Sequence, residues 1–195
     1  PPRVGRPGAW AGLTRGGNIR RIGLSNLAGW QVVKAAQLVA EFGLEIGVIQ
    51  PMYSLVKRQA EVEILPMAQD LGILVAPYSP LGGGLLTGKY SQGGTGRISE
   101  DPRYAARYGQ EAMHGAAAGL AALANDLGTH PATLAVAWAA AHPSRPTPII
   151  SARSTEQLSP SLAAMTYVMD PETYAAIAAL SPTPPPATDR LEEQA

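Results

Sequence analysis

Short apolar runs alternate with helical patterns along most of the chain. The first run, residues 19–25, lies between a pair of glycines and Asn26 and is typical of a buried strand. Over residues 31–42 the apolar positions instead recur at spacings of three and four, which predicts an amphipathic helix ended by Gly43. The pattern therefore begins with a strand followed by a helix.

Two further apolar runs, residues 46–50 and 73–78, predict two more strands. A helical stretch at residues 62–71 lies between them, and it accommodates Pro66 only if this proline lies in the first helical turn. The three runs begin at residues 19, 46 and 73. This regular spacing of strand–helix units predicts a parallel sheet.

Helical patterns dominate the second half of the chain. One helix is predicted over residues 113–127 and ends at Gly128, and another begins at Pro131. The helix that begins at Pro131 is expected to bury one face, formed by Leu134, Trp138 and Ala141.

A fourth short strand is predicted at residues 148–151, followed by helices over residues 155–165 and 171–180. Asp170 is the expected N-cap of the last helix, and Pro171 its first residue. The pattern thus contains four strands, each followed by helix.

These elements divide the chain into three parts. We expect residues 1–18 to contain the remainder of a preceding helix, indicated by Trp10 and Leu13, and residues 19–180 to form one α/β unit. Residues 181–195 are rich in proline and are expected to form a mobile tail. Because the chain has 195 residues, fewer than the roughly 250 of an eight-stranded α/β barrel, we expect part of a larger fold.

Composition narrows the function classes. Fifteen basic residues balance fifteen acidic ones, so no net field attracts nucleic acid or an anionic membrane. A hydrophobic content of 46% predicts a packed core, and no apolar run is long enough to cross a membrane. The absence of cysteine excludes disulfides and thiolate catalysis, so we expect a cytoplasmic protein without a metal centre.

Polar residues follow all four predicted strands, where parallel α/β folds bind ligands. The strand ends are Ser25-Asn26, Gln50, Tyr78 with the glycines at 82–84, and residues 151–154 with Arg153. Amide side chains suit a carboxamide, a tyrosine ring suits stacking, and glycine backbone with an arginine suits phosphate. The set fits a flat aromatic amide attached to phosphates. The alternative is that Asn26 caps a helix and the glycines form a flexible turn.

Four stretches of the sequence resemble the carboxy-terminal half of the aldo/keto reductase family. They read IRRIGLSN (19–26), QPMYSL (50–55), PYSPLGGGLLTGKY (77–90) and PIISARSTEQL (148–158), and the similarity runs in order from about Ala9 to about Leu180. This resemblance implies a (β/α)8 TIM barrel of which only about four βα units are present. It also implies NADP(H) bound across the carboxy-terminal face and a small-molecule aldehyde or ketone as substrate.

The resemblance further implies cofactor contacts that follow NADP(H) from its nicotinamide to its adenosine end. They are Ser25, Asn26 and Gln50 at the carboxamide, Tyr78 at the nicotinamide ring, Ser79, Leu81 and Gly83 along the pyrophosphate, Leu86 and Lys89 in a loop over the cofactor, and Arg153 and Gln157 near the 2′-phosphate.

The chain departs from the family pattern near its last motif. Ser151 replaces a common glycine, and Pro160 with Ser161 replaces an acidic residue followed by asparagine. Two helix starts stay open there, because Ser154 and Gln157 have the spacing of a capping box, whereas Pro160 suits a helix that begins at Ser159. The arginines at positions 97, 103 and 107 either line a substrate mouth or lie on a solvated surface.

The family's catalytic tyrosine, lysine, aspartate and histidine come from its first four strands, which have no counterpart in this chain. His114, His130 and His142 lie in helical or cap contexts, and we interpret them as structural. We therefore expect the cofactor-binding half of a reductase, with no catalytic residue of its own and with about 100 or more residues preceding Pro1.

Two rival hypotheses remain. The first is a non-catalytic nucleotide-binding or regulatory half-barrel, which forms a homo-oligomer through its open sheet edges. The second is a degenerate product that has no stable fold.

Overall fold

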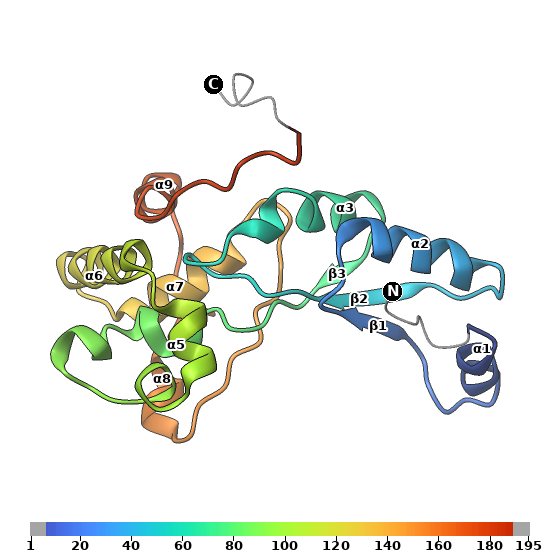
Figure 1. Cartoon of the computed structure of the whole chain (residues 1–195), viewed down its shortest axis with the longest axis horizontal. Coiled ribbons are helices and arrows are strands. Elements are labelled where there is room, and N and C mark those ends of the chain that lie inside the picture. The colour runs from blue at the N-terminus through green and yellow to red at the C-terminus, as the bar shows by residue number, and fades with distance from the viewer. Residues whose placement is uncertain (1–6, 189–195) are drawn as a thin grey trace.

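Three parallel strands form the sheet of this α/β chain. The computed structural model describes residues 7–188. Its strands are β1 (Ile22–Ser25), β2 (Ile46–Gln50) and β3 (Leu74–Val75), which lie side by side in the order β1-β2-β3 (Figure 1). β2 has the predicted bounds, β1 begins later than predicted, and the parallel direction is confirmed.

The prediction of a fourth strand at residues 148–151 is wrong, because these residues form no strand in the structure. Two backbone hydrogen bonds nevertheless join this segment to the chain at the end of β3. The Thr147 N–H donates to the Val75 carbonyl, and the Ile149 N–H to the Pro77 carbonyl, both at 2.8 Å. The reciprocal bond would need an N–H at residue 77, and proline has none. Residues 147–149 therefore lie beside the end of β3 without forming a strand. β3 itself ends at Val75 rather than at Tyr78.

Helices α2 (Gly29–Ala40) and α3 (Ile64–Asp70) cover one face of the sheet (Figure 1). Both helices lie close to their predicted places, and Pro66 is the third residue of α3, in its first turn as expected. The opposite face of the sheet is open within the described part of the chain, where 54% of Leu74 is exposed. A short 3-10 helix, η1 (Gln59–Glu61), precedes α3.

Helix α1 (Pro7–Arg15) lies beyond the amino end of β1, where the sequence indicated only part of a helix. Ala11 is buried and Trp10 packs against the main core. The helix is therefore part of the packed structure. Residues 1–6, which belong to the expected first part, lie outside the described residues.

The remaining elements gather at the other end of the molecule (Figure 1). They are η2 (Gly82–Thr87), η3 (Lys89–Gln92), α4 (Arg97–Glu100), α5 (Pro102–Tyr108), α6 (Glu111–Asp126), α7 (Pro131–Ala140), α8 (Thr155–Ala163) and α9 (Pro171–Ala178). Asp170 caps α9 by accepting from the Thr173 N–H at 2.8 Å, which confirms that prediction.

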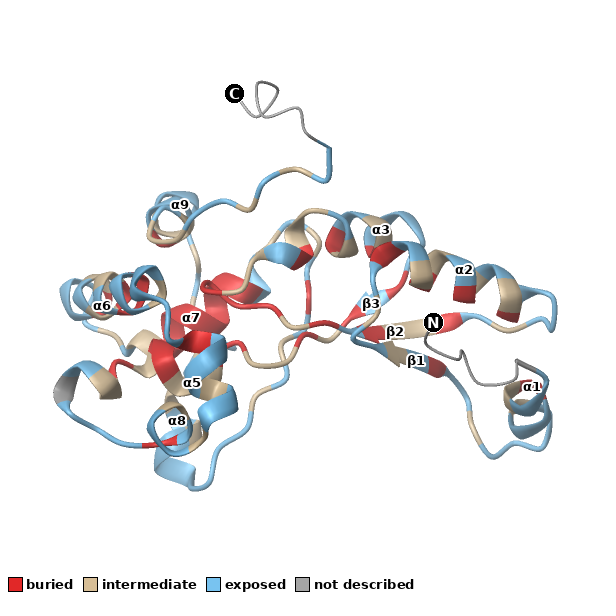
Figure 2. Ribbon diagram, in the orientation of Figure 1, coloured by how far each residue is buried: buried red, intermediate tan, exposed pale blue. Residues whose placement is uncertain are grey.

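Helix α7 lies at the centre of this end and is buried on every side from Ala132 to Ala139 (Figure 2). The predicted burial of Leu134 and Trp138 is confirmed, whereas that of Ala141 is wrong, because Ala141 follows the helix and is exposed. Apart from Thr133, the helix from Pro131 to Ala140 is apolar. A helix that is apolar all round belongs inside a fold. The other helices of this end pack around α7.

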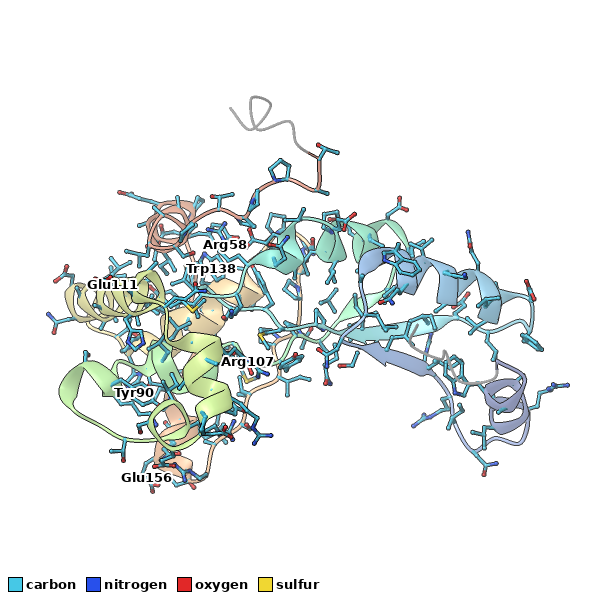
Figure 3. The ribbon with its side chains drawn as sticks, in the orientation of Figure 1. Arg58, Tyr90, Arg107, Glu111, Trp138 and Glu156 are labelled. Atoms are coloured by element: carbon cyan, nitrogen blue, oxygen red, sulfur yellow. The ribbon has the colours of Figure 1, made fainter. Side chains whose placement is uncertain are left out.

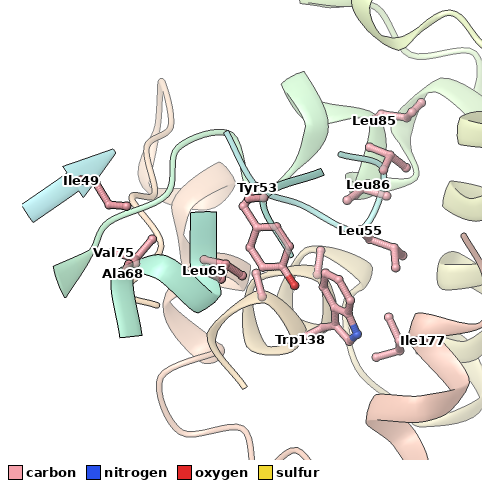
Figure 4. Close-up of a cluster of buried hydrophobic side chains, with 14 of the residues drawn as sticks. Ile49, Tyr53, Leu55, Leu65, Ala68, Val75, Leu85, Leu86, Trp138 and Ile177 are labelled. Carbon is pink, nitrogen blue, oxygen red and sulfur yellow. The ribbon is translucent and has the colours of Figure 1, made fainter. Parts of the chain in front are cut away.

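Tyr53 and Trp138 lie close together in the buried core, among aliphatic side chains such as Leu55 and Ile177 (Figure 4). Trp138 is fully buried, stacks on Tyr174 at 5.7 Å between ring centroids and contacts Tyr53 at 5.5 Å. Arg58 lies over the Trp138 ring, donates two hydrogen bonds to Glu61 at 2.9 Å and one to the Ala178 carbonyl at 3.0 Å (Figure 3). This contact ties the end of α9 to η1.

Helix α8 begins at Thr155 and continues through Pro160. Ser154 is its N-cap and accepts from the Gln157 N–H at 3.4 Å, so the alternative start at Ser159 is wrong. The Pro160 carbonyl accepts from the Thr133 hydroxyl at 2.7 Å, which joins α8 to α7.

Two further observations limit the kind of protein. Among residues 7–188, every helix is too short or too polar to span a bilayer. The same residues contain no cluster of side chains that would ligate a metal ion. Residues 181–188 lead away from α9, and the rest of the predicted tail lies outside the described residues.

Candidate functional site

The strand ends bring four polar residues together. Parallel register places Ser25 opposite Gln50, and the Ser25 hydroxyl donates to the Gln50 carbonyl at 2.9 Å. The Tyr78 hydroxyl donates to the Asn26 side-chain oxygen at 2.7 Å. Ser25, Asn26, Gln50 and Tyr78 therefore form one group, as their positions after neighbouring strands predict.

The backbone at this edge adopts two unusual conformations. Asn26 has φ 56° and Ser79 has φ 58°, both in the left-handed region. This region costs a non-glycine residue about 1 kcal/mol, somewhat less for asparagine. Such strain persists where the surroundings impose it and is concentrated at functional sites.

The alternative role of Asn26 as a helix cap is wrong. The N-cap of α2 is Ala28, whose N–H donates to the Gln31 side chain at 2.9 Å. Asn26 instead directs its amide toward Tyr78, across the end of β2. Its side chain is exposed and available to a ligand.

A smaller cavity of about 300 Å³ opens at the ends of β1 and β2. Its polar wall contains Ser25, Asn26 and Gln50, and its other walls are largely apolar, with Val32 and Ile64 from the covering helices. An apolar pocket with a few amide groups is the usual form of a small-molecule site.

A larger cavity of about 840 Å³ is lined in part by Tyr78. It collects seven of the predicted cofactor residues, namely Tyr78, Ser79, Leu81, Gly83, Lys89, Arg153 and Gln157. Residues from the loop after β3 thus face residues from the start of α8. Tyr78 stands between the two cavities, because it lines the larger one and bonds to Asn26, which lines the smaller one.

The glycine turn in the larger cavity has a fixed geometry. Gly82, Gly83 and Gly84 have φ of 56°, 67° and 97°. A Cβ on Gly83 would lie 2.9 Å from Tyr104 and 3.0 Å from Tyr108, whose side chain is fully buried. Packing against these two tyrosines therefore favours glycine at position 83.

Positive charge lines the larger cavity. Lys89, Arg97 and Arg153 contribute three cations, and Glu156, at the start of α8 (Figure 3), is the one acidic residue in its described lining. Of the two alternatives for Arg97, a cavity lining and a solvated surface, the structure favours the lining, because the loop after β3 brings Arg97 to the larger cavity. It also lies over the Tyr104 ring at 5.6 Å.

The other two arginines of this segment do not line either cavity in the described structure. Arg103 pairs with Asp101 at 2.8 Å and is 85% exposed along its side chain. Arg107, labelled in Figure 3, is exposed and lies over the Tyr104 ring at 5.5 Å from its centroid. These two residues fit the solvated-surface interpretation.

Leu86 differs from the other predicted cofactor residues. Its side chain is fully buried in the core and lines neither cavity. Its side chain therefore contributes to the hydrophobic core rather than to a cavity wall.

Two histidines have structural contacts. His130 caps α7 by accepting from the Ala132 N–H at 3.0 Å, and His142 accepts from the Ser144 N–H at 3.1 Å. Burial lowers the pKa of both rings. His130 also lines the larger cavity, whereas His114 is exposed on α6.

Comparison with known proteins identifies similar proteins over most of the chain. The model of the aldo/keto reductase family matches residues 8–182. The uncharacterized oxidoreductase YrpG of Bacillus subtilis is 38% identical over 161 residues, which are 81% of this chain and 48% of that protein. Protein tas of Escherichia coli is 30% identical over 175 residues, 88% of this chain and 51% of that protein.

A shorter similarity extends to mammals. Aflatoxin B1 aldehyde reductase member 2 of Mus musculus is 40% identical over 79 residues, 40% of this chain and 22% of that protein. The chain spans about half the length of the two bacterial relatives.

Proposed function

The chain belongs to the aldo/keto reductase family, and from that premise we propose that it carries the NADP(H)-binding part of an oxidoreductase that reduces aldehydes or ketones. The bound cofactor would supply a hydride. The chain's own residues bind that cofactor and orient it.

The observation that carries this proposal is the position of Tyr78 between two chemically different cavities. An extended dinucleotide has an aromatic amide at one end and phosphates at the other. The smaller cavity offers amide groups, and the larger one offers glycine backbone and three cations. The donors present therefore fit both ends of NADP(H).

Each group of residues has a separate task in this proposal. Asn26 and Gln50 hold the carboxamide, and the Tyr78 ring supports the nicotinamide by stacking. Lys89, Arg97 and Arg153 neutralise the phosphates, and the backbone at the glycine turn approaches the pyrophosphate because no Cβ intervenes. Gln157 assists at the adenosine end, where its side chain accepts from the Arg153 N–H at 3.4 Å.

We further propose that the chain contributes about half of a (β/α)8 barrel. Support comes from the open face of the sheet at Leu74, from the unpaired outer edge of β1 in the described structure, and from the length of the relatives. Protonation of a carbonyl oxygen requires an acid, which the other half would supply. The lack of cysteine suits a reducing compartment such as the cytoplasm.

Titration of the purified chain with NADPH and with NADH tests the cofactor proposal. We expect saturable quenching of tryptophan fluorescence by NADPH and weaker binding of NADH. Arg153→Gln should lower NADPH affinity about tenfold, since it removes a charge-assisted bond to phosphate. Arg103→Gln is the matched control and should change nothing, because Arg103 is exposed and pairs only with Asp101 among the described residues. Non-saturable binding, or equal effects of the two variants, would contradict the proposal.

The rival half-barrel oligomer differs in its assembly. Sheet edges that stay open favour pairing of two copies. Sedimentation of the chain with and without NADPH separates the two ideas. A dimer that forms together with cofactor binding would favour the rival, and a monomer that binds NADPH would exclude it.

A further inference from the structure

We propose that the Tyr78 hydroxyl is a positioning group, which holds the Asn26 oxygen toward itself so that the Asn26 N–H2 group faces a bound primary carboxamide. This inference rests on the proposed function, because it concerns the nicotinamide end of the same site. It gives the Tyr78 hydroxyl a role in orienting Asn26, in addition to the role of the Tyr78 ring in stacking on the nicotinamide.

The position of Tyr78 is set independently of Asn26. The Tyr78 N–H donates to the Pro51 carbonyl at 3.0 Å, and the Tyr78 carbonyl accepts from the Tyr53 N–H at 3.3 Å. Asn26 follows β1 and Tyr78 follows β3, so their contact crosses the end of β2, a span of roughly 10 Å between next-nearest strands. The chain after β2 thus holds Tyr78 in place while its hydroxyl reaches Asn26.

The contact gives the amide a direction. The Tyr78 hydroxyl donates to the Asn26 Oδ1 atom at 2.7 Å, the usual length of a good O–H···O bond. A phenolic oxygen is a strong donor and a weak acceptor because its lone pair is delocalised into the ring, whereas an amide oxygen is a strong acceptor. The orientation with Oδ1 toward Tyr78 is therefore favoured over the flipped one, in which Nδ2 would donate to the phenol.

Ser25 provides the complementary group. Its hydroxyl hydrogen is used on the Gln50 carbonyl at 2.9 Å, so the free lone pairs of Oγ act as acceptors. Asn26 and Ser25 then present a donor and an acceptor side by side. A primary carboxamide has a C=O and an N–H2 group, and it matches this pair in one orientation only.

The backbone of Asn26 supports the same conclusion. Its φ of 56° costs energy that a glycine would avoid, yet the amide is exposed and makes no cap contact with α2. Strain of this kind is expected where a side chain must point in a set direction. Phenylalanine at position 78 would stack equally well, so the hydroxyl requires a separate reason, and orientation of Asn26 supplies it.

Tyr78→Phe tests the proposal, with binding measured by calorimetry for NADPH and for 2′-phospho-ADP-ribose, which lacks the nicotinamide. We expect NADPH to bind about three- to tenfold more weakly, as for the loss of one hydrogen bond, and 2′-phospho-ADP-ribose to bind as before. In an Asn26→Ala background, Tyr78→Phe should have no further effect. Tyr174→Phe is the control for loss of a hydroxyl, because Tyr174 lies in the core beside Trp138.

Asn26→Asp tests the polarity directly, because an ionised carboxylate accepts hydrogen bonds and does not donate them. We expect this variant to lose nicotinamide-dependent affinity, measured as NADPH binding relative to 2′-phospho-ADP-ribose. Retention of that affinity would show that Asn26 acts as an acceptor and would overturn the proposal. An equal loss for both ligands in Tyr78→Phe, or no loss for either, would also overturn it. If the unaltered chain does not bind NADPH, the proposed function itself fails.

Discussion

Replacement of Gly83 by alanine measures how strongly packing fixes the glycine turn. Alanine at φ 67° costs about 1–2 kcal/mol from the left-handed backbone. Its Cβ would also lie 2.9 Å from Tyr104 and 3.0 Å from Tyr108, and relief of this overlap costs a further 1–3 kcal/mol or so. We therefore expect Gly83→Ala to lower the free energy of unfolding by about 2–5 kcal/mol.

Gly128 provides a matched control for the backbone part of this cost. It has a similar φ of 62°, and a Cβ added there meets no atom within 4 Å. Gly128→Ala should therefore cost only about 1–2 kcal/mol. Urea denaturation followed by circular dichroism measures both variants, and their difference isolates the contact with Tyr104 and Tyr108. Equal destabilisation of the two variants would refute the idea that packing against these tyrosines fixes the turn.

Three further predictions concern the core, pH and backbone strain. Arg58→Met should lower the free energy of unfolding by about 2–4 kcal/mol, because it leaves the largely buried Glu61 carboxylate without its cation; in the same urea assay the exposed Arg103→Met should change it by less than about 0.5 kcal/mol. Burial lowers the pKa of His130 and His142, so the unfolded chain binds protons more readily and stability should fall as pH drops below about 6.5. His130→Asn, which keeps a capping oxygen, should flatten that loss in melts from pH 7.5 to about 5.5, and an unchanged slope would contradict the assignment. Ser79→Gly should raise stability by about 0.5–1 kcal/mol by relieving a φ of 58°, and a thermal melt in which Ser79→Ala gains as much would contradict this.

Local periodicity was enough to predict the elements that pack in the ordinary way. β2 lies where its apolar run begins and ends, and α2 follows its three-and-four spacing, because each buries one face against a neighbour. The grouping of Ser25, Asn26, Gln50 and Tyr78 was also predictable, since parallel strands end at one edge.

The errors arose where a residue's role depends on its neighbours in space. Residues 147–149 lie beside residues 75–77, and a regular parallel pair would need an N–H at residue 77, which proline lacks. The sequence does not show that these two segments lie side by side, so it does not show that the N–H is needed. The alanine-rich α7 is compatible with one buried face or with complete burial, and its central position decides the matter.

The candidate site shows the same limit. An asparagine between a strand and a helix can cap that helix or can point toward a ligand, and the sequence is the same in both cases. The φ of 56° at Asn26 and the N-cap at Ala28 are seen only in the structure. Arg97 reaches the larger cavity because the loop after β3 folds back through η3 and α4. No spacing rule in the sequence indicates that return.

Nuclear magnetic resonance of the 20.3 kDa chain tests most directly the claim that one dinucleotide spans both cavities. We expect NADP+ to shift the side-chain amide signals of Asn26 and Gln50 together with the backbone signals of Gly82, Gly83 and Gly84. 2′-Phospho-ADP-ribose should shift only the glycine signals. Shifts confined to one cavity with NADP+, or shifts at neither, would contradict the account.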